Sequence, residues 1–213
     1  MFPQQPQQQF RTAGADVQIF YGSGAVANCS FGWTKPIGVS HIYMLLIGGG
    51  ADGDGTNGGG SGAVAVWYGA AQNIPNVLQL LISTGGSSIR TISGSSTISL
   101  ITANASTTVT GASATTANQF TALGFFQSVK GQDGSPGDPG ASTTTFLSGG
   151  GASGLTTANY GYTASISKAG YFMLQPMIVG VGGAGGGTSV GGIGCGGALS
   201  GKGGPGMVLI ASW

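Results

Sequence analysis

The chain has 213 residues, of which 40% are hydrophobic, so it can bury a sizeable core and is too apolar to be disordered throughout. Only 5% of its residues are charged, with six Lys or Arg, five Asp and no Glu, and the net charge is +1. This balance offers no basic surface to nucleic acid, and one His without any Glu leaves almost nothing for paired acid–base catalysis. We therefore expect no enzyme, no cofactor and no nucleic-acid partner. Every apolar run is broken before 18 residues, so no membrane span is expected either.

A Gln- and Pro-rich arm, residues 1–12, opens the chain, and it lacks the basic and apolar regions of a Sec-type signal. Gln and Pro bury too little apolar area to offset their ordering entropy, so we expect the arm to order only against a partner. Phe2 and Phe10 are the candidate anchors for that contact. The remainder, 13–213, is predicted to form a single glycine-rich β domain.

Short apolar segments rich in β-branched and aromatic residues recur along this domain, and none shows a helical period with caps. They predict an all-β fold, either a glycine-rich β-sandwich or jelly-roll-like sheets. The segments 41–47 and 207–213 are apolar on both alternating faces, which is typical of central strands. The remaining predicted strands are 17–21, 63–68, 77–82, 96–101, 162–167, 171–174 and 177–181.

Four of these strands, 41–47, 63–68, 77–82 and 207–213, are expected to share one sheet system, because the two most apolar strands flank glycine runs that need a common support. The same pattern predicts low solvent access for Leu45, Ile47, Val208 and Ile210.

Two glycine runs follow a period of three residues, which is the period of the polyproline II helix. Because glycine has no Cβ, such runs can lie close together and hydrogen-bond side by side. We therefore predict ordered polyglycine or polyproline II segments whose third-position glycines face neighbouring backbones, whereas Gly186 and Gly204, which are out of this register, face outward. The third-position glycines are Gly50, Gly53, Gly59, Gly62, Gly182, Gly185, Gly191, Gly194, Gly197, Gly203 and Gly206.

Two further segments stand out by composition. A Ser/Thr-rich stretch at about 87–121 has few large aromatic residues and is predicted to be an insertion of exposed strands or long loops. Residues 131–142 are four Gly-X-Y triplets with a collagen-like composition, too few to form a stable triple helix alone. They are either a proline-stiffened loop or a short threefold contact within a pre-formed trimer.

Several motifs of reactive chemistry occur in incomplete form. The P-loop spacing that ends at Lys202 lacks the following Ser or Thr, and the nucleophile-elbow pattern around Ser189 lacks a base, since the only His, His41, lies in an apolar strand. Cys29 and Cys195 could pair or could be two buried thiols.

Oxygen ligands for calcium could come from Asp52, Asp54 and Asn57. The stretch lacks the spacing and the distal Glu of an EF-hand loop, so these residues are only weak candidates and a solvated turn is favoured.

Residues 31–68 resemble the opening of the glycine-rich domain of phage and other viral structural proteins, in which a W-x-x-P-x-G-V motif, here with Trp33 and Pro36, leads into an apolar strand and a glycine run. The ending is similar to the closure of that domain, with Trp213 as its last residue. The glycine runs also resemble, less closely, the polyglycine II sandwich of phage adhesins.

The resemblance implies a virion structural protein associated with a capsid, spike or tail fibre and located on the particle surface or an appendage. Its partners would be other copies of itself, with a trimer favoured, and other virion proteins. One alternative is an adhesin that binds a host surface receptor through exposed aromatic residues: Phe125, Phe126, Tyr160 and Tyr162. A second alternative is an extracellular, ice-binding-like glycine lattice with a flat Thr face at 106–116.

Overall fold

The computed structural model describes residues 10–12, 14–23, 28–93, 96–134, 163–165, 178–181 and 188–213. In these residues the fold is all-β apart from two short 3₁₀ helices, η1 (Ala71–Asn73) and η2 (Thr121–Leu123). The largest sheet is antiparallel and contains, in spatial order, β1 (Phe10–Thr12), β2 (Ala15–Tyr21), β12 (Met207–Ser212), β4 (His41–Ile47), β5 (Val64–Ala70) and β9 (Phe125–Val129).

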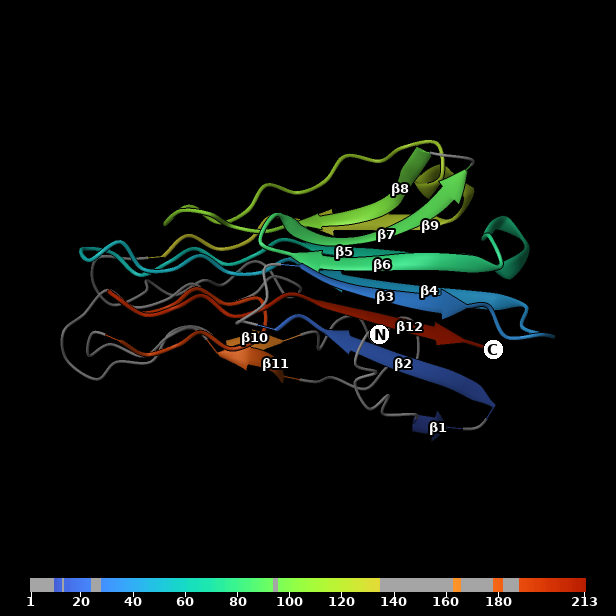
Figure 1. Ribbon diagram of the computed structural model, residues 1–213, viewed down its shortest axis with the longest axis horizontal. Helices are drawn as coiled ribbons and strands as arrows, with labels where there is room; N and C mark the ends of the chain where they lie inside the picture. Colours follow the sequence, from blue (N-terminus) through green and yellow to red (C-terminus); the bar gives the residue numbers. More distant parts are fainter. Residues whose placement is uncertain are drawn as a thin grey trace.

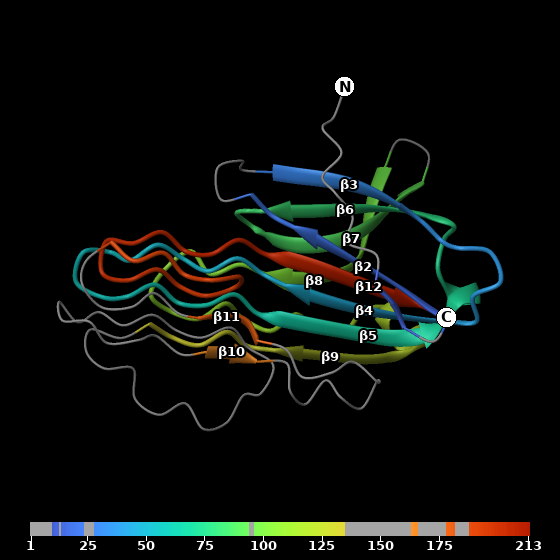
Figure 2. The same ribbon diagram turned by 90° about the horizontal axis from the view of Figure 1, so that it is seen from below.

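A second antiparallel sheet faces the first, in an arrangement consistent with a β-sandwich (Figures 1 and 2). Its strands, in spatial order, are β3 (Asn28–Thr34), β6 (Val77–Ser83), β7 (Gly86–Ser93) and β8 (Ser96–Asn104). A separate two-stranded sheet pairs β10 (Thr163–Ser165) with β11 (Ile178–Val181). The all-β prediction is therefore confirmed.

The two central strands of the large sheet, β4 and β12, are buried on both faces. One hydrophobic cluster lies between the two sheets and includes Leu46 of β4 and Leu80 of β6. A second cluster lies on the opposite face of the large sheet and includes Leu45 of β4 and Leu209 of β12. The predicted burial is confirmed, since none of the four residues is more than 1% exposed: Leu45, Ile47, Val208 and Ile210.

The prediction that segment 77–82 shares the sheet of β4, β5 and β12 is wrong. This segment forms β6, which pairs with β3 and β7 in the facing sheet. Its alternating burial shows the reason, because its even-numbered residues pack inward and Val77 and its odd-numbered neighbours face outward. A strand covered on one side only belongs in an outer layer.

Part of the Ser/Thr-rich stretch at 87–121 belongs to the second sheet. Its residues 87–93 and 96–104 lie in β7 and β8, which make up half of the four-stranded sheet. Its few large residues are placed where they are needed, since Ile89 and Ile101 are opposite each other across the two strands and are both buried in the core. The Ser/Thr-rich composition gave no indication of these buried positions.

Other predicted segments are only partly described. Residues 10–12, assigned to the arm, form β1 and pair with β2, so the arm can extend no further than residue 9. Phe2, segment 171–174 and most of the collagen-like segment lie outside the described residues. In the part of the chain that the structure covers, no helix has the length and apolar character that a membrane crossing requires.

Candidate functional site in the glycine lobe

The sandwich strands continue at one end into a set of extended runs, which we call the glycine lobe: residues 48–63, 105–112, 130–134 and 188–206. The lobe extends beyond the sheets, with its runs side by side (Figures 1 and 2). Each run is attached to a buried strand, because β4 enters the lobe at residue 48, β5 leaves it after residue 63 and β12 leaves it after residue 206. The two-sided burial of β4 and β12 thus anchors the lobe.

Backbone hydrogen bonds join runs that are far apart in the sequence. The amide nitrogen of Gly50 donates to the carbonyl oxygen of Gly204 at 2.9 Å, and the amide nitrogen of Gly59 donates to that of Gly197 at 2.8 Å. A third run joins them, because the amide nitrogen of Gly60 donates to Thr108 at 3.0 Å. None of these residues belongs to an assigned strand. Lateral bonds between separate runs therefore hold the lobe together.

The glycines of the lobe leave no room for a side chain. A Cβ built on Gly50 would collide with the carbonyl oxygen of Cys195, and one on Gly53 with that of Ala198. The other crowded third-position glycines described here are Gly59, Gly62, Gly191, Gly197 and Gly203, which face backbone atoms, and Gly194 and Gly206, whose contacts include side chains. Gly194 also has a φ of 70°, a conformation that favours glycine. Gly182, Gly185 and Gly186 lie outside the described residues.

The prediction that Gly204 faces outward is wrong. A Cβ on Gly204 would collide with the carbonyl oxygen of Gly192, and one on Gly201, also out of the predicted register, would collide with that of Ser189. The reason is geometric, because a run inside a bundle has neighbours on more than one side. A period of three marks only one of those sides.

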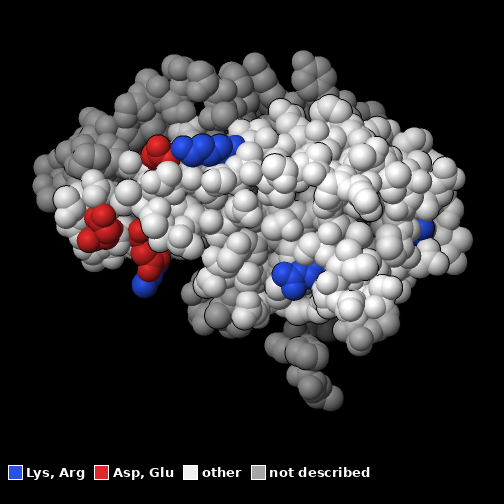
Figure 3. All heavy atoms as spheres, turned by 90° about the horizontal axis from the view of Figure 1, so that it is seen from above, with Lys and Arg blue, Asp and Glu red and all other residues white. Residues whose placement is uncertain are grey.

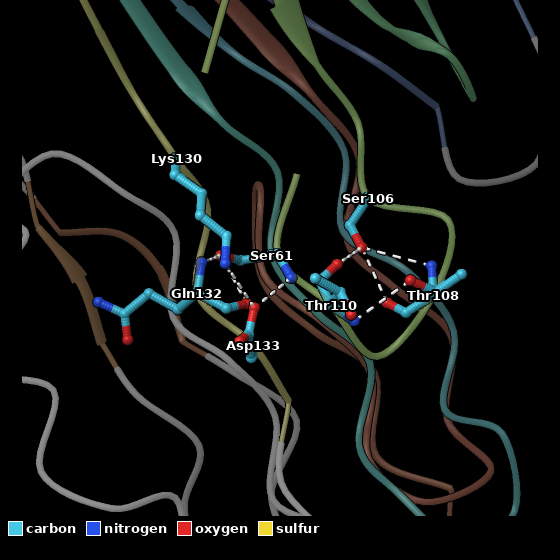
Figure 4. A network of polar contacts seen from close by, with 8 residues as sticks. Ser61, Ser106, Thr108, Thr110, Lys130, Gln132 and Asp133 are labelled. Carbon is cyan, nitrogen blue, oxygen red and sulfur yellow. Dashed lines mark hydrogen bonds and ion pairs between the residues drawn. The ribbon is translucent and has the colours of Figure 1, made fainter. Parts of the chain in front are cut away.

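Three polar side chains stabilise the lobe (Figure 4): Ser61 and Asp133 make bonds between runs, and Ser106 makes bonds within its own run. The buried Ser61 hydroxyl accepts a hydrogen bond from the amide nitrogen of Gln132 at 2.6 Å. The buried Ser106 hydroxyl lies between the carbonyl oxygens of Thr108 and Thr110, at 2.8 and 2.7 Å. Neither serine was predicted as a site residue, although Ser61, an isolated Ser between two glycines, carries a sequence signal for such a bond.

Asp133 joins the run 130–134 to the run 105–112. Its Oδ1 accepts a hydrogen bond from the amide nitrogen of Gly111 at 2.7 Å and forms an ion pair with Lys130 Nζ at 3.2 Å. The Gly111 bond, helped by Lys130 and opposed by partial burial, lowers the pKa of the Asp133 carboxyl below its usual value.

We expect Asp133→Asn to lower the melting temperature near about pH 6 and to have little effect near about pH 2. Because the folded-state pKa is lowered, the carboxylate stabilises the fold above its unfolded pKa of about 3.9, and this stabilisation is lost as the pH falls through the folded-state value. The effect will be small, since the side chain is 60% exposed. Melting curves of both proteins at the two pH values measure it, and a difference that does not change with pH would contradict it.

The weak calcium candidates serve other bonds. Asp54 Oδ1 accepts from the amide nitrogens of Thr56 and Asn57, at 2.8 and 2.6 Å, and its Oδ2 accepts from the Asn57 side chain at 3.0 Å. Asp52 binds Lys202 Nζ at 2.6 Å and the Gly203 amide nitrogen at 2.8 Å. Among the described residues no cluster of three or more His, Cys or acidic side chains could hold a metal ion. The site therefore resembles a side-chain-capped turn.

The pKa values of these two carboxyls are both lowered. For Asp54 the main cause is the Asn57 side-chain amide. For Asp52 partial burial acts to raise the pKa, but the hydrogen bonds from Lys202 and Gly203 and the charge of Lys202 outweigh it. Both carboxylates are thus stabilised in their charged form by groups of the lobe itself.

The residues that carry the resemblance to viral structural proteins lie in the sandwich. Trp33 is 2% exposed in the core, and Pro36 follows β3 in the turn toward β4. Trp213 stacks on Tyr68 and His41, with ring centroids 5.9 and 6.3 Å apart. No protein-family model matches the chain, and no curated protein is significantly similar to it. The resemblance therefore remains an interpretation of motifs.

The remaining reactive motifs are not assembled into a site. His41 lies at the start of β4, whereas Ser189 lies in the glycine lobe beyond the end of that strand. Lys202 of the P-loop spacing is paired with Asp52. Cys29 and Cys195 are not joined by a disulfide: the first is half-buried in β3, and the second is buried in the lobe, where its thiol donates to the carbonyl oxygen of Ile193.

Two hydroxyls of the segment 106–116, where a flat Thr face was expected, are bound within the chain. The Ser106 hydroxyl is buried, and the Thr115 hydroxyl donates to the carbonyl oxygen of Thr102 at 2.8 Å. What this part of the lobe does form is one wall of a groove of about 800 Å³. The other walls are residues 49–54 and 202–206, and the end of β6 closes it.

Proposed function

We propose that the chain is a non-enzymatic structural protein of a virion, associated with a capsid, spike or tail fibre, that works as a homo-oligomer among other virion proteins. The observation that carries the proposal is the glycine lobe. Ordering glycine is more costly in backbone entropy than ordering any other residue, yet the lobe fixes its glycines by lateral backbone bonds. A lobe whose backbone is fixed in this way can pack against other subunits as a rigid unit.

The finer form of the fold belongs to the same proposal. We infer that the runs of the lobe are polyproline II segments in a polyglycine II-like lattice. The lateral bonds between runs and the lack of room for a Cβ support this inference, since a lone polyproline II run has no hydrogen bonds of its own.

The scarcity of charge supports an assembled state. Charged residues make up 5% of the chain, compared with about 25% in typical soluble domains. On the face shown in Figure 3, Lys, Arg and Asp occupy only a few small patches. A surface with so little charge has low colloidal stability unless neighbouring subunits cover it.

The trimer favoured by the collagen-like triplets gains no support from the described part of that segment. Gly131 and Gly134 pack inside their own lobe, where a Cβ would collide with the carbonyl oxygens of Ser61 and Gly58. Their amide nitrogens donate to Ala112 and Val109 at 2.8 and 2.7 Å. These glycines therefore contact their own chain and not a threefold axis.

The test is to locate the chain in particles. An antibody raised against the recombinant chain is used on gradient fractions of particles from the source of the sequence, and the bands are identified by mass spectrometry. We expect the chain to sediment with intact particles and to stay with them through a high-salt wash. A chain found only in the soluble or secreted fraction would refute the proposal.

The groove favours the adhesin as the second candidate. Its walls offer backbone groups together with Lys202 and Asp52. Among the aromatic residues named for this function, Phe125 is 50% exposed, and Tyr160 and Tyr162 lie outside the described residues. The isolated protein would then compete with particles for attachment to host cells, whereas a purely structural protein would not.

A further inference from the structure

β3 is the edge strand of the four-stranded sheet, and in the part of the chain that the structure describes its outer side is not paired. It pairs with β6 over seven consecutive positions without a bulge, from Asn28 to Thr34. No strand in the described residues pairs with its other side. An edge of this kind presents a row of backbone N–H and C=O groups that can pair with another strand.

The opposite edge of the same sheet is covered. The Thr115 hydroxyl donates to the carbonyl oxygen of Thr102, and the Asn118 side chain donates to that of Leu100, at 2.8 and 3.0 Å. A bulge next to Ile89 also interrupts the pairing of β7 with β8. Coverage and bulges are the means by which proteins protect an edge from pairing.

β3 has none of these protections. Its seven residues include no charge and no proline. The adjacent Lys35 is turned away, because its Nζ donates to the carbonyl oxygens of Ala71 and Ile74 at 3.0 and 2.8 Å. On the outer face, a Cβ at Gly32 would meet nothing within 4 Å. Within the described residues the edge is therefore uncharged, without a bulge and unobstructed at Gly32.

Exposed apolar side chains lie beside this edge. A shallow groove of about 370 Å³ crosses the outer face of β3, β6 and β7. Val77 and Ile92, which line it, are 62% and 66% exposed. A strand that paired with β3 would extend the sheet, and its side chains would lie next to this apolar surface.

We propose that β3 pairs antiparallel with β3 of a second copy about a two-fold axis, joining the two four-stranded sheets into one. Pairing centred on Phe31, the midpoint of Asn28–Thr34, uses all seven positions and places Ser30 opposite Gly32. A two-fold contact is isologous, so the same patch on both copies must fit itself without repulsion. An uncharged edge meets this requirement. The two Lys35 residues would be about 27 Å apart along the strands, well beyond the screening length of about 8 Å.

This contact goes beyond the proposed function, because it places the subunit contact at a sheet edge and not in the glycine lobe. It also predicts two-fold symmetry where the collagen-like triplets suggested three-fold. Measurements on the recombinant full-length chain test it without any particle, so its failure leaves the virion proposal standing.

The experiment measures the molar mass of the full chain by size-exclusion chromatography with light scattering. One chain has a mass of 20.8 kDa, and we expect the parent to have twice this mass. The double variant Ser30→Lys/Gly32→Lys should have the mass of one chain, because the pairing sets Lys opposite Lys on the exposed face. The control Thr97→Lys/Ser99→Lys puts the same two charges on exposed positions of β8, at the covered edge, and should keep the parent mass.

Circular dichroism of the double variant shows whether it is folded, which the exposure of Ser30 and the open space at Gly32 lead us to expect. A parent with the mass of one or three chains, or a folded double variant with the mass of two, would overturn the proposal. Hydrogen exchange provides a test without mutation: protection of 28–34 should rise with protein concentration, and that of 96–104 should not. Exchange at 28–34 that is independent of concentration would also overturn it.

Discussion

Gly50→Ala should disrupt the glycine lobe, whereas Gly49→Ala, one residue earlier, should be tolerated. A Cβ on Gly50 collides with the carbonyl oxygen of Cys195, and the next nearest atoms are also backbone, so no side chain can rotate away. A Cβ on Gly49 has its nearest neighbour, the carbonyl oxygen of Gly204, at 3.4 Å, which is an ordinary contact. The two positions thus differ in the space that is open to an added Cβ, although they are adjacent in the sequence.

The expected loss for Gly50→Ala is about 3 kcal/mol, at the upper end of overpacking penalties, because several lateral bonds must shift together. This loss corresponds to a fall in melting temperature of roughly 6–12 °C for a chain of this size. For Gly49→Ala we expect a change within about 1 kcal/mol of the parent, since Ala also restricts the unfolded chain. Thermal melts of the three proteins, with amide exchange at residue 50 as the local probe, measure both effects.

Equal melting temperatures for the two variants would mean that the lobe behaves as a loose linker in solution. The same outcome would remove the observation on which the proposed structural function rests. A loss in both variants would show instead that the runs pack more tightly on the side of Gly49 than the structure describes.

The sequence predicted that the glycine runs are ordered by lateral bonds, and it missed how many sides of each run are in contact. The period of three correctly selected Gly50 and Gly53 as crowded positions. It failed for Gly204, because the neighbours of a run come from segments far away in the chain and their number cannot be derived from spacing. Only the three-dimensional bundle places the carbonyl oxygen of Gly192 against Gly204.

The sequence likewise predicted some strands of the sandwich and missed others. Segments with continuous apolar character, such as β4 and β12, were predicted with their burial. β3, β7 and β9 were missed. β3 has only three apolar side chains, which alternate with polar residues and Gly, β7 is rich in Ser, and β9 is only five residues long. The assignment of β6 to the facing sheet depends on long-range pairing, which local patterns do not contain.

The side chains that fasten the lobe could not be chosen from the sequence either. Ser61, Ser106 and Asp133 are short polar residues in a chain rich in such residues. The roles of Ser61 and Asp133 depend on which amide nitrogen of another run lies within about 3 Å, the reach of a hydrogen bond, and that of Ser106 depends on how its own run turns. Spacing could identify the run but not its bonding partner.

Truncation of adjacent leucines should distinguish a strand covered on both faces from one covered on a single face. In β4, Leu45→Ala and Leu46→Ala should each reduce the free energy of unfolding by about 2–5 kcal/mol. Both side chains are fully buried, the first in the outer cluster that Cys195 of the lobe also joins and the second between the sheets.

In β6 the same change should have unequal effects. Leu80 is fully buried between the sheets, so Leu80→Ala should match the two β4 variants, whereas Leu81 on the outer face is only half-buried and Leu81→Ala should cost about 1 kcal/mol. Chemical denaturation of the four variants measures these losses with one type of substitution throughout. If Leu45→Ala were as mild as Leu81→Ala, the outer face of the large sheet would be open in solution, and the anchoring of the glycine lobe by β4 would have to be abandoned.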